Sequence, residues 1–300
     1  MNATNTIPFH APLNAEEGNI MWRTKLCLGL MGLAPTPTEE IKLLRQTGFE
    51  GFFTGWGPNS PIGEWKKLAD DLGMMYQSIH APFHNAAKMW TECEGTQAAI
   101  DEQLACLRAC AENEVPIMVA HAFIGFKDHS PTDFGVSNFE IIVKEAEHLG
   151  VKVAFENTEG EEYLMALMEL AKTYKSVGFC WDTGHELCYN YGKDMPGLYK
   201  DLLICTHLND NLGIKDYNGE ITWHDDLHLL PFDGIADWDD IAARLVRSNF
   251  TAPLTFELGR GSKPNRHEND LYGKISSEEY VAEVYKRACR VAALVQKKSK

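Results

Sequence analysis

Six short apolar segments of the sequence each end in a side chain that can bind a metal ion or move a proton. A carboxylate at the end of a buried strand is costly unless it is paired or bound to a cation. Six such placements at equivalent positions therefore indicate one shared site rather than six separate structural roles. The six side chains are His80, His121, Glu156, Asp182, His207 and Glu257.

Four of these side chains form an oxygen-rich set with one nitrogen: Glu156, Asp182, His207 and Glu257. Three carboxylates and one imidazole suit a hard or borderline divalent cation. We expect one ion per chain, with Mn²⁺ favoured and Mg²⁺, Co²⁺ or Zn²⁺ as alternatives. Two glutamates beside one ion can also transfer protons, because an ion that binds a substrate oxygen acidifies the neighbouring C–H bond.

The segments that position these side chains alternate with amphipathic ones along the chain. We predict strands at 25–31, 51–56, 76–80, 117–121, 152–156, 177–182, 203–207 and 254–257. Helical stripes lie between them, and capping boxes at Thr36–Glu39 and Ser276–Glu279 mark two helix starts. Eight such units predict a (β/α)8 TIM barrel in one α/β domain, 24–300, after a polar leader segment, 1–23. A doubly wound open sheet is the alternative.

Composition excludes several classes of protein. The chain has 300 residues with 28 Lys+Arg and 43 Asp+Glu, a net charge of −15, and 44% hydrophobic residues. This hydrophobic content excludes wholesale disorder, and the acidity argues against nucleic-acid or anionic-membrane partners. The longest apolar run, of about ten residues, is too short to span a bilayer. With no signal-peptide pattern and no CxxC pair among eight cysteines, we expect a cytoplasmic protein with free thiols.

The motifs at the strand ends resemble those of the xylose-isomerase-like TIM-barrel superfamily. This group includes sugar isomerases and epimerases, inosose dehydratases and endonuclease-IV-type enzymes. The resemblance covers nearly the whole chain from residue 25 to 298. It is carried by IHAPF at His80, FENTEG at Glu156, WDTGH at Asp182, HLND at His207 and a glutamate, Glu257, that closes the last strand.

The resemblance implies roles for individual residues. Glu156 and Glu257 match the two glutamates that serve as metal ligands and as the acid/base pair of the sugar epimerases. Asp182 and His207 match the other two ligands. His185 matches a substrate-contacting histidine, and Glu162 matches, by spacing alone, a substrate-binding glutamate of the ketose 3-epimerases.

Position in the sequence adds four further candidates for substrate binding. His80 and His121 end the third and fourth predicted strands. His228 lies in a long loop, about 208–235, whose DLHLLPFDG segment resembles the H-x-x-PGEG segment of sugar isomerases and epimerases. Arg260 follows Glu257 in a Gly-rich polar segment, 259–274, that could bind an anionic group or lie in a solvated loop.

Three functions compete at this point. The first is a divalent-metal-dependent isomerase or epimerase of a sugar or related polyol, acting by proton abstraction next to a polarised carbonyl; an inosose-type dehydratase would use the same metal and base. The second is an endonuclease-type phosphodiesterase, disfavoured by the charge of −15. The third is a non-enzymatic sugar-binding subunit, disfavoured by the complete ligand quartet. Association with further copies of the chain stays open.

Overall fold

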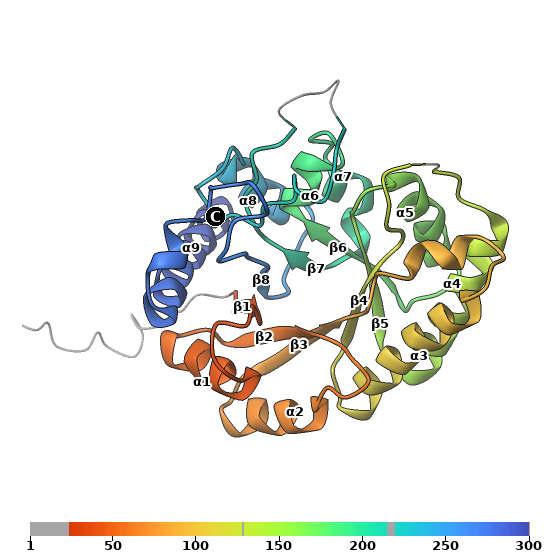
Figure 1. Cartoon of the computed structure of the whole chain (residues 1–300), viewed down its shortest axis with the longest axis horizontal. Coiled ribbons are helices and arrows are strands. Elements are labelled where there is room, and N and C mark those ends of the chain that lie inside the picture. The colour runs from red at the N-terminus through yellow and green to blue at the C-terminus, as the bar shows by residue number, and fades with distance from the viewer. Residues whose placement is uncertain (1–23, 128, 215–219, 300) are drawn as a thin grey trace, which may run out of the picture.

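The computed structural model describes residues 24–127, 129–214 and 220–299. The predicted leader, 1–23, lies outside the described residues. Eight parallel strands form one sheet in the order β7-β6-β5-β4-β3-β2-β1-β8, with helices around it (Figure 1). The strands are β1 (Leu26–Gly29), β2 (Gly51–Gly55), β3 (Met75–His80), β4 (Ile117–His121), β5 (Lys152–Glu156), β6 (Val177–Asp182), β7 (Leu203–His207) and β8 (Leu254–Phe256).

The sheet closes between β7 and β8 by a short seam. Leu208 pairs in parallel with Phe256 just beyond the end of β7, and the Leu208 amide donates to Thr255 O at 2.8 Å. The Thr255 amide donates in turn to Thr206 Oγ1 at 3.1 Å. The expected single-domain (β/α)8 TIM barrel is confirmed, and its strand ends meet on one face.

The described part of the chain contains nine α-helices and four 3₁₀ turns. The α-helices are α1 (Pro37–Thr47), α2 (Ile62–Asp71), α3 (Thr96–Glu112), α4 (Asp133–Leu149), α5 (Glu161–Met168), α6 (Thr183–Cys188), α7 (Met195–Tyr199), α8 (Trp238–Arg247) and α9 (Ser277–Lys298). The 3₁₀ turns are Ala86–Trp90, Glu169–Lys172, Lys200–Leu202 and Tyr272–Lys274. Among the described residues, no helix is both long and apolar enough to cross a membrane.

The ends of the first and last strands differ from the sequence prediction. Strand β1 stops at Gly29, because the amides from Met31 onward turn toward a buried carboxylate, Glu40, in α1. Met31 and Leu33 donate their amides to Glu40 at 2.7 and 3.1 Å. Strand β8 stops at Phe256, so Glu257 follows the ladder directly instead of ending it.

The two predicted helix starts are both correct, and only one is a full capping box. At α9, Ser276 and Glu279 satisfy each other's amides reciprocally. At α1, Thr36 accepts from the Glu39 amide, while the Glu39 carboxylate accepts from the Thr36 hydroxyl instead of its amide.

All eight cysteines are free, as expected.

A buried ion pair fixes α8 against the site-bearing strand β6. Arg244 Nη1 lies 2.6 Å from Glu186 Oε1, and its guanidinium lies over the Trp181 ring at 4.7 Å. Glu186 also accepts from Trp181 Nε1 at 3.0 Å. Burial raises the pKa of the Glu186 carboxyl although Arg244 opposes that shift. Removing one partner would leave the other charge buried without compensation.

We therefore expect Arg244→Ala to lower the free energy of unfolding by about 3 kcal/mol. The matched control is Arg247→Ala on the same helix, whose side chain is 59% exposed; it should change that free energy by no more than about 0.5 kcal/mol. Urea denaturation monitored by circular dichroism measures both. Equal losses in the two variants would contradict the importance given to the buried pair.

Candidate active site

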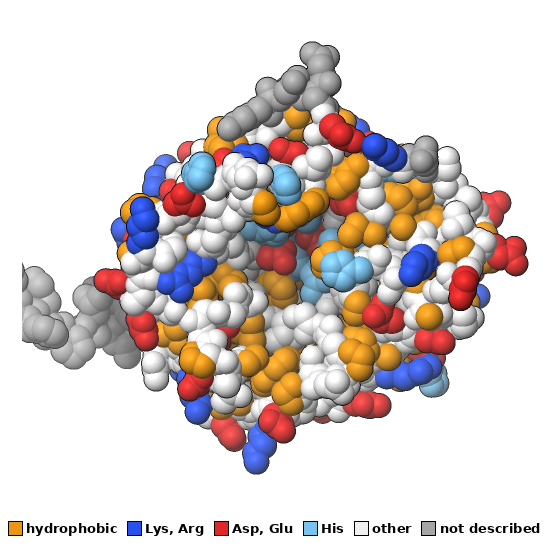
Figure 2. All heavy atoms as spheres, in the orientation of Figure 1, with side chains coloured by type: hydrophobic (Ala, Val, Ile, Leu, Met, Phe, Trp, Pro, Cys, Tyr) orange, Lys and Arg blue, Asp and Glu red, His pale blue; other side chains and the backbone are white. Residues whose placement is uncertain are grey.

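Four strands deliver the predicted ligand set to one point at the barrel mouth. Glu156, Asp182 and His207 end β5, β6 and β7, and Glu257 follows β8. One ligand atom from each lies within 4.8 Å of the others. The first three side chains are buried and the Glu257 side chain is 27% exposed. Figure 2 shows a hollow in this face, with acidic and histidine side chains at its floor and hydrophobic ones around it.

His207 lies at the centre of this set. Its Nδ1 atom is 3.0 Å from Glu156 Oε1 and 3.0 Å from Glu257 Oε2. The Phe53 ring stacks on the imidazole with centroids 4.7 Å apart, which fixes the ring plane. A single nitrogen therefore faces two carboxylates that come from opposite sides of the seam.

The electrostatics of these three groups are coupled. Burial alone would raise the pKa of the Glu156 carboxyl, but the positive charge of His207 and hydrogen bonds from neighbouring histidines hold that pKa well below its usual range. Burial is likewise outweighed at Glu257, where His207 lowers the pKa to about 2. Conversely, Glu257 and Glu156 overcome burial and hold the pKa of His207 well above its usual value. The cluster therefore attracts positive charge.

A divalent cation fits this donor set. The four side chains offer three carboxylates and one imidazole within the span that one ion can bridge, and two of the carboxylates already surround a shared positive group. Such oxygen-rich sets with one nitrogen suit hard and borderline ions. Glu156, Asp182, His207 and Glu257 would hold the ion.

Asp182 is held in place by groups that the sequence analysis did not assign. Its Oδ1 caps α6 by accepting from the His185 amide at 2.6 Å, and its Oδ2 accepts from Asn209 Nδ2 at 2.8 Å. Asn157 Oδ1 accepts from the Asp182 amide at 2.8 Å. A Cβ atom at Gly184 would lie 1.9 Å from Asn209 Oδ1, so only glycine leaves room for that amide. The FENTEG, WDTGH and HLND motifs thus meet at one carboxylate.

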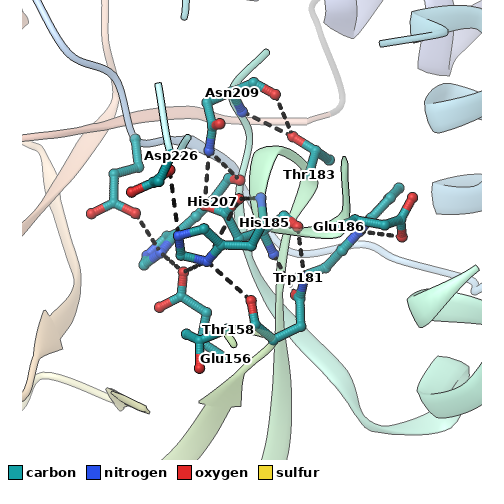
Figure 3. A network of polar contacts seen from close by, with 12 residues as sticks. Glu156, Thr158, Trp181, Thr183, His185, Glu186, His207, Asn209 and Asp226 are labelled. Carbon is teal, nitrogen blue, oxygen red and sulfur yellow. Dashed lines mark hydrogen bonds and ion pairs between the residues drawn. The ribbon is translucent and has the colours of Figure 1, made fainter. Parts of the chain in front are cut away.

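Asn209 is itself fixed by a reciprocal contact with α6 (Figure 3). The Asn209 backbone N–H donates to Thr183 Oγ1 at 2.9 Å, and the Thr183 hydroxyl donates to the Asn209 backbone carbonyl at 2.6 Å. These contacts are the second layer that orients a metal ligand. The presence of Asn157 and Asn209 inside the quoted motifs was the signal that could have identified them.

Two of the predicted substrate-binding histidines lie beside Glu156. His80 Nε2 is 3.2 Å and His121 Nε2 is 3.4 Å from Glu156 Oε2. His121 Nδ1 is buried and has no hydrogen-bond partner among the described residues. Burial lowers the pKa of His121, so its imidazole is neutral near pH 7 and can donate or accept.

His185 and His228 meet on the other side of the hollow, around Asp226. His228 Nε2 is 2.7 Å from Asp226 Oδ2. His185 Nε2 is 3.5 Å from Asp226 Oδ1, and Figure 3 shows this pair. Lys263 Nζ lies 3.6 Å from Asp226 Oδ2. Asp226 and Lys263 were not among the predicted binding residues, although Asp226 lies two positions before His228.

Hydrogen bonds to Asp210, just after β7, hold the loop that carries Asp226 and His228. Asp210 and Leu229 exchange backbone hydrogen bonds at 2.8 and 2.9 Å. The Asp210 carboxylate accepts from the Phe232 and Ala236 amides and from the Trp238 indole at 2.9, 3.0 and 2.8 Å. The last residue of the HLND motif therefore fixes the loop, while its histidine faces the two glutamates.

The structure does not bring Glu162 and Arg260 into the cluster. Glu162 lies on α5 and pairs with His129 at 2.7 Å, in a neighbouring hollow. Arg260 borders the site, but its guanidinium donates to Tyr272 O at 3.1 Å and to Ser277 Oγ at 3.2 Å. These contacts use its donors to hold the loop after β8 against the start of α9.

The amide that orients Asp182 yields a test of the site. We expect Asn209→Ala to weaken binding of a divalent cation about 10- to 100-fold, because the ligand loses its orienting hydrogen bond. Isothermal titration of the chelator-stripped protein with Mn²⁺ measures the affinity. Asn59→Ala, at an exposed position in the β2–α2 loop, is the control. Unchanged Mn²⁺ affinity in Asn209→Ala would show that this contact does not support a ligand.

Known proteins share this architecture. The family model described as "Xylose isomerase-like TIM barrel" matches residues 41–276. An uncharacterized protein of Sinorhizobium fredii, y4fM, is 38% identical over 113 residues, which are 36% of this chain and 33% of that protein. The alignment thus spans about a third of the length of this curated relative.

Two solved structures have the same fold at low identity. A structure of L-ribulose 3-epimerase superposes with a TM-score of 0.68 at 13% identity, covering 92% of this chain and 97% of that one. The IOLI protein with a bound zinc atom gives a TM-score of 0.70 at 17% identity, covering 91% and 99%. Together with the family match, the barrel and its motifs show that this chain belongs to the xylose isomerase-like TIM barrel family.

Proposed function

We propose that the protein is a divalent-metal-dependent isomerase or epimerase that acts on a sugar or related polyol. The observation that carries this proposal is a cluster of three carboxylates and one imidazole at the ends of four strands. One ligand atom of each side chain lies within 4.8 Å of the others. Burying so much like charge is costly unless a cation compensates it. One ion per chain, with Mn²⁺ favoured over Mg²⁺, Co²⁺ and Zn²⁺, meets that need.

The two glutamates are suited to move protons. When bound, a divalent cation polarises substrate oxygens and acidifies an adjacent C–H bond. Glu156 and Glu257 would then act as base and acid at the substrate carbon, since they approach His207 Nδ1 from β5 and from the end of β8. Return of the proton to the opposite face of the same carbon gives epimerisation, and return to the neighbouring carbon gives isomerisation.

The other polar groups of the hollow would bind substrate hydroxyls. His80 and His121 border Glu156, while His185 and His228 lie around Asp226. Histidine can donate to one hydroxyl and accept from another, which suits a polyol. Glu162 pairs with His129 away from the cluster, while Arg260 borders the hollow and its guanidinium holds the loop after β8.

The comparisons support this class of reaction. One structural neighbour is named as an L-ribulose 3-epimerase, and another, IOLI, is described with a bound zinc atom. An inosose-type dehydratase remains the alternative, because it would need the same ion and the same base. An assay that separates epimer, isomer and dehydrated product decides between them.

A nuclease function has less support. The His185–Asp226–His228 group could hold a further ion, but Lys263 Nζ already lies 3.6 Å from Asp226 Oδ2. An ammonium group there supplies the positive charge that a second ion would bring. With a net charge of −15, the chain also lacks the excess of basic residues that binds a phosphate backbone. We therefore propose a small-molecule substrate. We also propose a cytoplasmic location, which agrees with the free thiols of the eight cysteines.

The acid/base pair gives the direct test of the proposal. On a panel of ketoses, aldoses and inososes, we expect Glu156→Gln and Glu257→Gln each to lower kcat by at least about a hundredfold, because a proton-transfer group is lost. The exposed Glu169→Gln is the matched control. Metal content measured in parallel separates loss of the ion from loss of the base. Full activity in either active-site variant would contradict the proposed mechanism.

A further inference from the structure

Glu257, one of the four proposed ligands, lies where two hollows meet. One hollow, of about 420 Å³, lies toward β1 and β2 and includes Phe53 and Trp56 in its lining. The other, of about 520 Å³, lies toward the loops that follow β4, β6 and β7. Both are lined by His80, Phe83, His84 and Glu257. A molecule larger than one sugar ring can therefore lie across Glu257 with a part in each hollow.

The larger of these two hollows has both polar and apolar side chains in its lining. His121, His185, Asp226, His228 and Glu257 line it near the cluster. The rest of the lining includes His80, His84, Gly125, Glu159 and Lys263. It also includes five apolar or aromatic side chains from separate loops, here called the apolar wall: Phe83, Ile124, Phe126, Tyr189 and Trp223. Hydrophobic side chains surround the hollow in the space-filling view (Figure 2).

Three aromatic side chains of this wall offer ring surface to a bound group. Phe126 and Tyr189 pack edge to face with centroids 5.6 Å apart. Trp223, on the β7–α8 loop, is 53% exposed, and Lys263 Nζ lies 5.5 Å from its ring centroid. A large aromatic surface left open beside a polar site is a feature of ligand pockets, where apolar walls surround a few placed polar groups.

This mixed lining sets a limit on the substrate. A hydroxyl group that leaves water needs a new hydrogen-bond partner, and the apolar wall offers few. A free sugar, which carries hydroxyls around its whole ring, would match only the polar side chains of the lining. We propose that the substrate is a carbonyl-bearing sugar with a flat apolar substituent, as in an aryl glycoside whose sugar ring carries a ketone, with the sugar at the cluster and the substituent against the apolar wall. This inference rests on the proposed sugar function.

Binding, rather than turnover, tests the inference, because simple glycosides have no free carbonyl and serve as non-reacting probes of the apolar wall. Wild-type protein loaded with Mn²⁺ is titrated calorimetrically with paired phenyl and methyl glycosides of glucose, galactose, mannose, xylose and fructose. We expect at least one phenyl glycoside to bind about tenfold more tightly than its methyl partner, the scale expected from burying and stacking one ring. Phe126→Ala and Trp223→Ala should each remove most of that preference and leave affinity for the methyl glycoside unchanged. Phe134→Ala, an exposed aromatic residue of α4 outside both hollows, should retain it.

The outcomes separate this inference from the proposed function. If no phenyl glycoside binds better than its methyl partner, or if the preference survives both wall variants, the inference is overturned. Turnover of a free sugar by the same preparation would then leave the isomerase or epimerase function standing. Conversely, a phenyl preference abolished by the wall variants supports the inference even if every free sugar in the activity panel is inert.

Discussion

The site depends on a single contact, the His207 imidazole held between the Glu156 and Glu257 carboxylates at 3.0 Å from each. Two buried or partly buried carboxylates so close together repel each other unless positive charge lies between them. In the described structure, the histidine supplies that charge, and its pKa is held well above the usual value by the same glutamates, against the effect of burial. A bound divalent cation would take over this role and leave both glutamates ready for proton transfer.

The barrel makes this contact possible by joining distant segments. Glu156 and His207 are 51 positions apart in the sequence, yet parallel strands bring both to the same rim. The third carboxylate, Asp182, is held between strand ends by Asn157 and Asn209, and Gly184 leaves room for the Asn209 amide. The ligand set is therefore oriented by hydrogen bonds from motifs that are separate in sequence and adjacent in space.

The fold and the location of the site could be predicted because both depend on periodic signals. Alternating strand and helix patterns predicted the eight-stranded barrel, and the polar residue at each strand end predicted where the cluster would form. What could not be predicted depends on loops. Glu162 matched by spacing alone, but α5 directs it to His129, and the donors of Arg260 are used by Tyr272 and Ser277. Neither pairing leaves a trace in periodicity, and the same holds for Lys263 beside Asp226.

The proposed function requires one divalent cation bound by Glu156, Asp182, His207 and Glu257. The most direct measurement is an anomalous difference map from crystals of the Mn²⁺-loaded protein, collected on both sides of the manganese absorption edge. We expect a single strong peak per chain, surrounded by these four side chains. A map with no peak there, or with its main peak among His185, Asp226 and His228, would contradict it.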